Sequence, residues 1–449
     1  MMVRLRDLGE WAGGNTPSKA NAGYWTNGTV PWVSPKDMKI DEIASSRDCV
    51  TESALADGRV SLVREGSVLF VTRSGILAHT FPVAITNLPV TINQDLKALT
   101  PKLGVSPKYV AHAVRGASRR ILNECSKHGT TVASIDTNAL LEFEIPMVDL
   151  DEQLRIVAEI EKQFSRLDEA VANLKRVKAN LKRYKAAVLK AAVEGRLVPT
   201  EAELARREGR RYETGAQLLQ RILETRRSQW KGKGKYKEPT APDTTDLPAL
   251  PEGWVWSTMP QLGELNRGKS KHRPRDDERL YGGPYPFIQT GDVRRSKGSI
   301  TEHGQTYSEL GLQQSRLWPP GTLCITIAAN IAETGILKFA ACFPDSVVGF
   351  IADKGAITTQ YVDYFIRTAR NDLDRFASAT AQKNINLDVL GGVTIALPPL
   401  VEQHRIVAEV DRRLSLVLEI DHQIDVNLRR GETMRQAILT KSFVHAHGG

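Results

Sequence analysis

One short motif in this 449-residue chain has the spacing needed to bind a nucleotide. Residues 263–270 read Gly-Glu-Leu-Asn-Arg-Gly-Lys-Ser and satisfy the phosphate-loop pattern Gly-x-x-x-x-Gly-Lys-Ser. A working phosphate loop opens a helix whose N-terminus holds the phosphates. The residues that follow, 271–277, contain Pro274 and show no apolar periodicity. We therefore interpret the match as chance and keep a nucleotide-using enzyme as a rival hypothesis.

Other catalytic or metal-binding patterns are missing from the sequence. The four cysteines lie far apart without a Cys-x-x-Cys pair, and the histidines show no ligand spacing, which argues against structural zinc and a disulfide framework. No glycine-rich cofactor loop follows a strand, and no Asn-Pro-Pro-aromatic methylase motif or nuclease carboxylate cluster is present. We therefore expect no metal and no cofactor in this chain, and a binding role in place of catalysis.

Charge and polar segments point to DNA as the ligand. Lys and Arg number 61 against 52 acidic residues, and this net charge of +9 suits a polyanion. Arg and Lys can read guanine, Asn and Gln adenine, and Asp cytosine, while hydroxyls and cations hold phosphate. For each residue the alternative is a solvated loop position, so the prediction rests on the group. In the first half the candidates are Lys19, Lys36, Asp37, Arg73, Ser74, Asn93, Gln94, Lys127, His128, Thr130 and Thr131. In the second half they are Lys269, Lys271, Arg273, Arg275, Gln289, Thr290, Asp292, Arg294, Arg295, Asn330, Gln382, Lys383 and Asn384.

Two copies of one helix organise the chain around these segments. Residues 151–160 read Asp-Glu-Gln-Leu-Arg-Ile-Val-Ala-Glu-Ile, and residues 401–410 read Val-Glu-Gln-His-Arg-Ile-Val-Ala-Glu-Val. The preceding segments also match, since Val30–Val33 corresponds to Tyr285–Ile288 and Gly66–Phe70 to Gly321–Ile325. An internal repeat of this kind predicts two copies of one unit.

Each repeated helix carries a heptad seam typical of a coiled coil. The first seam has Lys178 and Lys185 at later positions and otherwise contains Ile160, Phe164, Leu167, Val171, Leu174 and Leu181. The second is interrupted by Asp421, Gly431 and Arg435, and its stripe contains Val410, Leu414, Val417, Ile420, Ile424 and Leu428. A rod of roughly 65 Å cannot bury such a stripe alone. We expect the two rods to pack antiparallel, with a pseudo-twofold axis relating the halves.

The sequence therefore predicts an α+β protein in five parts. Two globular domains with mixed, short-stranded sheets span 1–150 and 254–400, two long helices span 151–195 and 401–445, and a polar helix with a Lys- and Pro-rich linker spans 196–253. Expected strands are Val30–Ser34, Ser67–Val71, Val83–Thr86 and Leu96–Leu99, and expected shorter helices are Pro107–Glu124 and Glu201–Arg227. The linker lysines at 231, 233, 235 and 237 either touch DNA or, the reading we favour, are solvated. With no signal segment and no run long enough to span a bilayer, we expect a cytoplasmic location.

The two helix starts and several shorter motifs resemble one known family over essentially the whole chain. Gly14–Ser18, Tyr24–Trp25, Pro31–Met38, Lys235–Pro239 and Leu250–Trp254 resemble the DNA specificity subunit of type I restriction–modification systems. The resemblance implies a non-catalytic subunit whose two target-recognition domains each read half of a split DNA site from the major groove. It also implies that the helices fix the spacer between half-sites and dock two modification subunits. Those subunits would carry S-adenosylmethionine, and restriction subunits would use ATP and Mg²⁺.

A second rival hypothesis is a protein–protein scaffold whose globular domains bind other proteins. Salt distinguishes it from a DNA reader, because phosphate contacts release counterions and DNA affinity therefore falls steeply as salt rises.

Overall fold

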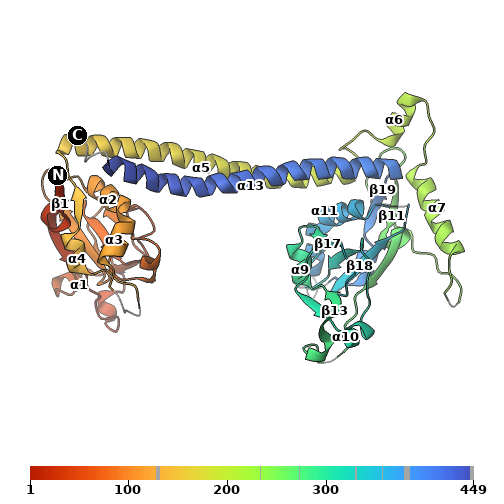
Figure 1. Ribbon diagram of the computed structural model, residues 1–449, viewed down its shortest axis with the longest axis horizontal. Helices are drawn as coiled ribbons and strands as arrows, with labels where there is room; N and C mark the ends of the chain where they lie inside the picture. The colour runs from red at the N-terminus through yellow and green to blue at the C-terminus, as the bar shows by residue number, and fades with distance from the viewer. Residues whose placement is uncertain are drawn as a thin grey trace. The chain divides into compact units, whose positions relative to one another are not determined.

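The structure is a computed structural model, and it describes residues 1–127, 132–232, 234–272, 274–328, 331–355, 357–378 and 385–444. The chain forms two compact units, one made of Met1–Val177 with Gln423–Gly449 and the other of Lys178–His422. Each unit contains one globular domain and parts of both long helices, α5 (Leu150–Val193) and α13 (Leu400–Val444) (Figure 1).

The first domain is built on a five-stranded mixed sheet with the strand order β2-β9-β6-β7-β4. A three-stranded sheet, β5-β3-β8, and a two-stranded sheet, β1-β10, complete it. The strands are β1 (Met2–Arg4), β2 (Gly9–Gly13), β3 (Val30–Val33), β4 (Glu42–Ile43), β5 (Asp48–Val50), β6 (Val68–Val71), β7 (Val83–Thr86), β8 (Thr91–Ile92), β9 (Leu96–Pro101) and β10 (Glu144–Pro146). The helices are α1 (Glu52–Ala56), α2 (Pro107–Gly116), α3 (Ser118–Cys125) and α4 (Thr137–Glu142), with 3-10 turns η1 (Leu5–Leu8), η2 (Ala22–Tyr24) and η3 (Gly75–Ala78).

The second domain repeats this topology with one difference: a single parallel bridge between Phe287 and Cys342 stands in place of the parallel pairing of β3 with β8. Its five-stranded sheet has the order β12-β18-β16-β17-β14, and two-stranded sheets β13-β15 and β11-β19 accompany it. The strands are β11 (Val255–Thr258), β12 (Gly263–Arg267), β13 (Tyr281–Phe287), β14 (Ser299–Ile300), β15 (Gln305–Tyr307), β16 (Leu323–Thr326), β17 (Thr334–Leu337), β18 (Val347–Ala352) and β19 (Thr394–Leu397). The helices are α8 (Met259–Leu262), α9 (Thr290–Arg295), α10 (Glu309–Gln313), α11 (Thr359–Ser378) and α12 (Leu387–Gly391), with the 3-10 turn η4 (Glu278–Leu280). The segments α6 (Glu201–Glu208) and α7 (Gly215–Ser228) stand between the two domains in sequence.

The phosphate-loop match lies mostly in a strand. Residues 263–267 form β12, which pairs antiparallel with β18 at the edge of the sheet, and the next helical element in the described part of the chain is the short turn η4. Because no helix N-terminus follows the glycine-rich end, the motif does not have the phosphate-binding geometry.

Two predicted helices are each divided in the structure. The expected helix Pro107–Glu124 becomes α2 and α3 because the carbonyls that end α2 are used by another element. Gln436 of α13 donates through Nε2 to the carbonyl oxygen of Gly116 at 3.0 Å, and Ala117 leaves the helical conformation. The expected helix Glu201–Arg227 becomes α6 and α7 because Gly209 takes a left-handed conformation (φ 65°) that terminates α6.

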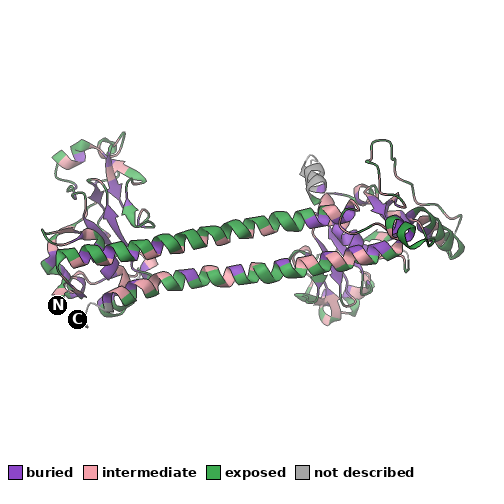
Figure 2. Ribbon diagram, turned by 90° about the horizontal axis from the view of Figure 1, so that it is seen from above, coloured by how far each residue is buried: buried purple, intermediate pink, exposed green. Residues whose placement is uncertain are grey.

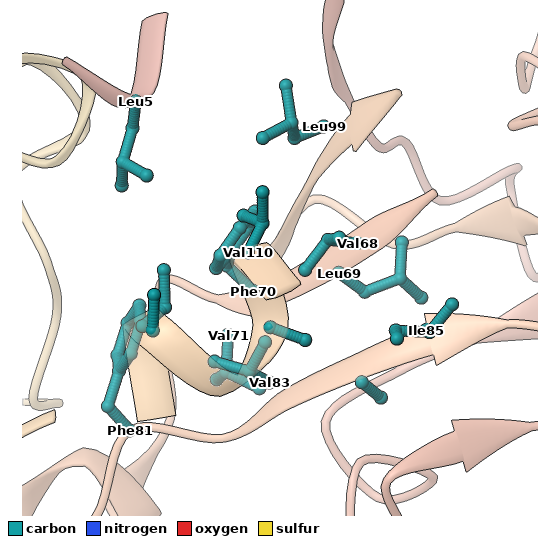
Figure 3. Close-up of a cluster of buried hydrophobic side chains, with 14 of the residues drawn as sticks. Leu5, Val68, Leu69, Phe70, Val71, Phe81, Val83, Ile85, Leu99 and Val110 are labelled. Carbon is teal, nitrogen blue, oxygen red and sulfur yellow. The ribbon is translucent and has the colours of Figure 1, made fainter. Parts of the chain in front are cut away.

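The core of the first domain joins its sheet to its helices. Side chains from β6, β7 and β9 meet Val110 of α2 in one buried cluster (Figure 3). The same core includes the start of α5, through Val157 and Ile160, and the end of α13, through Leu439 and Phe443. In the second domain, Val188 and Ala192 from the end of α5 share a core with Ile406 from the start of α13. Each domain therefore needs both long helices to complete its core.

The long helices pack antiparallel within each unit, as expected. In the first unit Arg435 contacts Asp168 and Gly431 lies against Val171, so the numbering of one helix falls as that of the other rises. Both long helices are mostly exposed along their length, with buried and half-buried residues at intervals (Figure 2). The predicted seam positions are among these buried or half-buried residues: Ile160, Phe164, Leu167, Val171, Leu174 and Leu181 on α5, and Val410, Leu414, Val417, Ile424 and Leu428 on α13. Ile420 was expected in the stripe but is 45% exposed. The seven-residue spacing from Leu414 to Leu428 places Asp421 on the seam instead.

The residues that interrupt the predicted seam each make a specific contact with the other long helix. Lys178 of α5 forms an ion pair with Asp421 of α13, with 3.7 Å between Nζ and Oδ1. Gly431 is buried where a Cβ would come within 3.2 Å of Cγ2 of Val171. Arg435 pairs with Asp168 at 2.9 Å and stacks its guanidinium over the Phe164 ring at 4.4 Å. The predicted discontinuities are therefore local layers of a continuous pairing within each unit.

Candidate nucleic-acid interface

A cleft of about 850 Å³ in the first domain collects most of the residues predicted to contact DNA there. They come from four loops far apart in sequence, and the predicted residues in the lining are Lys19, Lys36, Arg73, Ser74, Asn93 and Gln94. The sheet explains the convergence. Strands β6 and β9 are antiparallel with Val71 opposite Leu96, so the residues after one strand and before the other meet at one edge.

An ion pair positions Arg73 at this edge. Its Nε donates to Oδ1 of Asp95 at 2.7 Å, and Nδ2 of Asn93 donates to the other carboxylate oxygen at 3.1 Å. The Arg73 side chain is 57% exposed and that of Asp95 only 19%. In the described part of the chain the Nη groups of Arg73 make no hydrogen bond. The carboxylate thus fixes the plane of the guanidinium and leaves its Nη donors available to a ligand.

The cleft also contains residues that the sequence alone did not single out. The hydroxyl of Thr16 donates to the side-chain oxygen of Gln94, and Trp32, Asp48 and Ser134 line the walls. The signal for Asp95 was present as the run Asn93-Gln94-Asp95 after a short strand. Its pairing with a residue 22 positions earlier had no local signature.

Lys127 stands beside the cleft. Its backbone N–H donates to the carbonyl oxygen of Ser134, which lines the cleft, and its Nζ lies 3.9 Å from the Asp136 carboxylate. The neighbouring predicted residues His128, Thr130 and Thr131 lie outside the described residues.

The two predicted aspartates hold corresponding turns in the two domains. Oδ2 of Asp37 accepts a hydrogen bond from the backbone N–H of Ser34 at 2.9 Å. Oδ2 of Asp292 likewise accepts one from the backbone N–H of Gln289 at 2.8 Å. Asp37 also accepts from the backbone N–H of Arg47 at 3.0 Å. These bonds shape the loop that follows β3 and the equivalent loop that follows β13.

In the second domain, described residues of the predicted basic segment contact two other segments, one directly after α10 and one directly before β18. The backbone N–H of Lys271 donates to Oε1 of Gln314 at 2.5 Å, and Nη2 of Arg275 lies 3.1 Å from both carboxylate oxygens of Asp345. Asp345 precedes β18 as Asp95 precedes β9, so each domain places an acid–arginine pair at this edge of its sheet. The arginines come from different segments, so the sequence repeat does not relate Arg73 to Arg275.

Asp277 organises the rest of this segment. Its hydrogen bonds from Arg279, together with those from the backbone and from His272, hold the pKa of its carboxyl well below the usual range. The carboxylate therefore stays charged and ties His272 to Arg279.

The other predicted residues of the second domain are less concentrated. Asp292 and Arg295 form an ion pair at 2.6 Å and line a smaller cavity of about 340 Å³, which Ser296 and residues 299–304 complete. Gln289 donates through Nε2 to Gln305 at 2.6 Å, Thr290 begins α9, and Arg294 lies within that helix. Lys269 is anchored through its backbone N–H to the carbonyl oxygen of Phe343 at 3.1 Å. The predicted residues Arg273, Asn330, Gln382, Lys383 and Asn384 lie outside the described residues.

Two further findings constrain the chemistry of the part of the chain that the structure describes. It contains no group of three or more His, Cys, Asp or Glu side chains arranged to hold a metal ion. None of its helices combines the length and apolarity that crossing a membrane requires.

Comparisons with known proteins agree on one family. The type I restriction modification DNA specificity domain matches residues 1–183 and 251–429. The type I restriction enzyme EcoR124I/EcoR124II specificity subunit of Escherichia coli is 40% identical over 167 residues, which cover 37% of this chain and 41% of that protein. The MjaIX specificity subunit of Methanocaldococcus jannaschii is 30% identical over 176 residues, which cover 38% of this chain and 39% of that protein. Each match thus spans about two fifths of the relative.

Solved structures share the fold over nearly the full length. The HsdS subunit from Thermoanaerobacter tengcongensis has a TM-score of 0.60 at 19% identity, over 99% of this chain and 96% of that one. A chain from a structure of the assembly and conformational transition of the type I R-M system has a TM-score of 0.67 at 19% identity, over 99% and 97% of the two chains.

Proposed function

This chain belongs to the type I restriction modification DNA specificity family, and on that premise we propose that it is the non-catalytic, sequence-reading subunit of such a system. Each globular domain reads one half of a bipartite double-stranded DNA site. The chain itself uses no cofactor. S-adenosylmethionine would be bound by two modification subunits, and ATP with Mg²⁺ by restriction subunits.

The observation that carries this proposal is the cleft of the first domain. Loops that are distant in sequence converge there with the donors and acceptors that base edges require, and an arginine is held in one orientation by Asp95. A guanidinium whose Nη groups are free can bond O6 and N7 of guanine from the major groove. Lys19 and Lys36 are exposed at the same cleft and suit phosphate contacts that set the register.

The long helices support the second part of the proposal, a ruler that fixes the spacer between half-sites. A 44-residue helix such as α5 is about 66 Å long, which corresponds to roughly two turns of B-DNA. Two weak readers on one frame gain affinity through effective concentration when both can engage. Exposed faces along the helices would dock the modification subunits. A chromosomal DNA partner is also consistent with the expected cytoplasmic location.

Salt dependence of DNA binding tests the proposal against a protein-only scaffold. The complex of this chain with its modification subunit should bind DNA with an affinity that falls steeply as salt rises. Replacing Lys19 with Ala should reduce the slope of log K against log salt by about 1. Affinity that does not change with salt would contradict DNA recognition.

Replacing Arg73 tests base reading directly. In cells that carry this chain and its modification subunit, Arg73→Ala should relax one position of one half-site, because a bidentate contact contributes about 1–3 kcal/mol of discrimination. Asp95→Asn should have a similar effect, since it removes the charge that orients the guanidinium. Sequencing the methylated motifs measures both. Arg59→Ala, an exposed arginine outside the cleft lining, is the matched control and should leave the motif unchanged. An unaltered motif in Arg73→Ala would remove this residue from the reading set.

A further inference from the structure

In both domains, a glutamine at the repeated helix start fastens the long helix to the domain that precedes it. Oε1 of Gln153 accepts the backbone N–H of Ser106 at 2.9 Å, and Nε2 donates to the carbonyl oxygen of Val148 at 2.8 Å. Gln403 makes the equivalent bonds with Thr358 at 3.0 Å and Pro398 at 3.1 Å. Both glutamines are buried, so the repeated Gln ties the start of each rod to its domain.

The glutamate before each glutamine has different hydrogen-bond partners and a different degree of burial in the two halves. Glu402 is fully buried and accepts the backbone N–H of Glu201 at 2.8 Å and the indole N–H of Trp254 at 3.0 Å. Arg405, three residues later, donates to the Glu201 carboxylate at 2.6 Å. Glu201 is the first residue of α6, whose N-cap Thr200 forms a capping box. A helix N-terminus with an acidic first residue therefore covers the face formed by Glu402 and Arg405.

The corresponding face on α5, made of Glu152, Arg155 and Ile156, has no such cover among the described residues. Within the described ranges, only Arg155 donates to the carboxylate of Glu152, at 2.7 Å from Nε and 2.5 Å from Nη2. The two side chains are 34% and 76% exposed. Ile156 is half-buried, whereas its counterpart Ile406 is fully buried. We call Glu152, Arg155 and Ile156 the open helix-start face.

We propose that the open helix-start face docks a short helix of a partner polypeptide, seated as α6 is seated on the second rod. The first backbone N–H groups of that helix would bond Glu152, because a helix N-terminus attracts an anion. An acidic side chain at its first position would bond Arg155. Releasing the exposed Glu152–Arg155 pair costs little, since exposed ion pairs contribute weakly to stability. The partner sequence should contain Ser or Thr followed by Glu at the start of a helix.

The chemistry of this occupant is given by the chain itself. Thr200 and Glu201 show which groups match an identical Glu-Gln-x-Arg segment, and the charges are complementary at both contacts. The inference does not depend on what the globular domains bind, so its failure would leave the proposed function standing.

A peptide of residues 198–211, which contains the start of α6, is the probe. Fluorescence anisotropy with the full chain should show saturable binding with a dissociation constant below about 1 mM. Glu152→Gln should weaken it at least about tenfold, and Arg155→Glu should do the same. A peptide with Glu201→Arg should restore binding to the Arg155→Glu chain. Glu169→Gln, an exposed acid elsewhere on α5, is the matched control and should bind like the parent.

Several results would overturn the proposal. They are absence of saturable binding, binding that Glu152→Gln leaves unchanged, and failure of the charge reversal to restore it. Circular dichroism establishes that each variant is folded before binding is compared. Concentration-dependent dimerisation that Glu152→Gln abolishes would identify α6 of a second copy as the occupant and overturn assignment to a different polypeptide.

Discussion

Lengthening both long helices by one heptad should lengthen the spacer of the methylated site. The insertion duplicates residues 172–178 directly after Lys178 and residues 414–420 directly before Asp421. Because the helices are antiparallel and these two residues form an ion pair, both insertions enter at the same level and keep that pair intact. A heptad also restores the seam on each helix, so every layer above and below the insertion keeps its partners.

The expected change follows from helix and DNA geometry. Seven residues add about 10.5 Å of rod, which corresponds to about three base pairs at roughly 3.4 Å each. Three base pairs also rotate one half-site by about 100° around the DNA axis, whereas a heptad of coiled coil turns by only about 25°. DNA twist must absorb the difference, so we expect slower methylation together with the longer spacer.

Mapping methylated motifs in DNA from cells that carry the lengthened chain and its modification subunit measures the spacer. Both half-site sequences should stay as they are, because the reading loops are untouched. Seven residues inserted into the 240–247 linker should leave the spacer unchanged, and a heptad inserted into α5 alone should prevent assembly by shifting the seam. A spacer that stays constant when both rods are longer, or a changed half-site sequence, would refute the ruler.

Three further perturbations test other parts of the structure. Burial lowers the pKa of His112 to about 4. Below about pH 6.5 this histidine therefore binds a proton in the unfolded chain but not in the folded chain, and the free energy of unfolding should fall by up to about 3 kcal/mol between pH 7 and pH 4. Tyr364 is the equivalent of His112, since each stands three residues after a tyrosine, Tyr361 or Tyr109, that donates to a carbonyl oxygen of Ala396 or Pro146. His112→Tyr should therefore remove much of this fall in denaturant unfolding of the first unit, and an unchanged pH profile would contradict the role given to His112. Replacing both Lys178 and Asp421 with Leu should raise the free energy of unfolding by about 1 kcal/mol, as followed by helix circular dichroism, because a partly exposed ion pair contributes little and two leucines on the seam would bury apolar surface. Exchanging Trp254–Leu397 for the corresponding domain of a relative should change one half-site in the methylation map and leave the other; a change in both would show that the domains do not read independently.

The repeat and the heptad seam could be predicted because each is written in short-range periodicity. Leu167 and Leu174 lie seven residues apart, and that spacing alone requires a partner helix. The strands of the first domain were also predicted well, since β-branched runs between Gly, Pro and Asn favour strands wherever they occur. The helix Pro107–Glu124 was wrong as a single element because Gln436, more than 300 residues later, takes the carbonyl groups that would have continued it.

The candidate site likewise has features that the sequence predicts and features that depend on the tertiary structure. Residue types suggested Arg73, Asn93 and Gln94 as readers, and the structure brings them into one cleft. The ion pair with Asp95, which orients Arg73, depends on the antiparallel register of β6 and β9 and has no signature in either segment alone.

The sequence by itself determined that the chain has two similar halves, each with a rod and a set of polar loops, because periodicity and repetition are local and additive properties. Only the tertiary structure decided how the irregular residues are used. Asp421 meets Lys178, and Gly431 admits Val171. Glu402 is buried under α6 while Glu152 remains half-buried, although the two stand in the same sequence motif. These outcomes depend on which distant group reaches each side chain, and packing alone settles that.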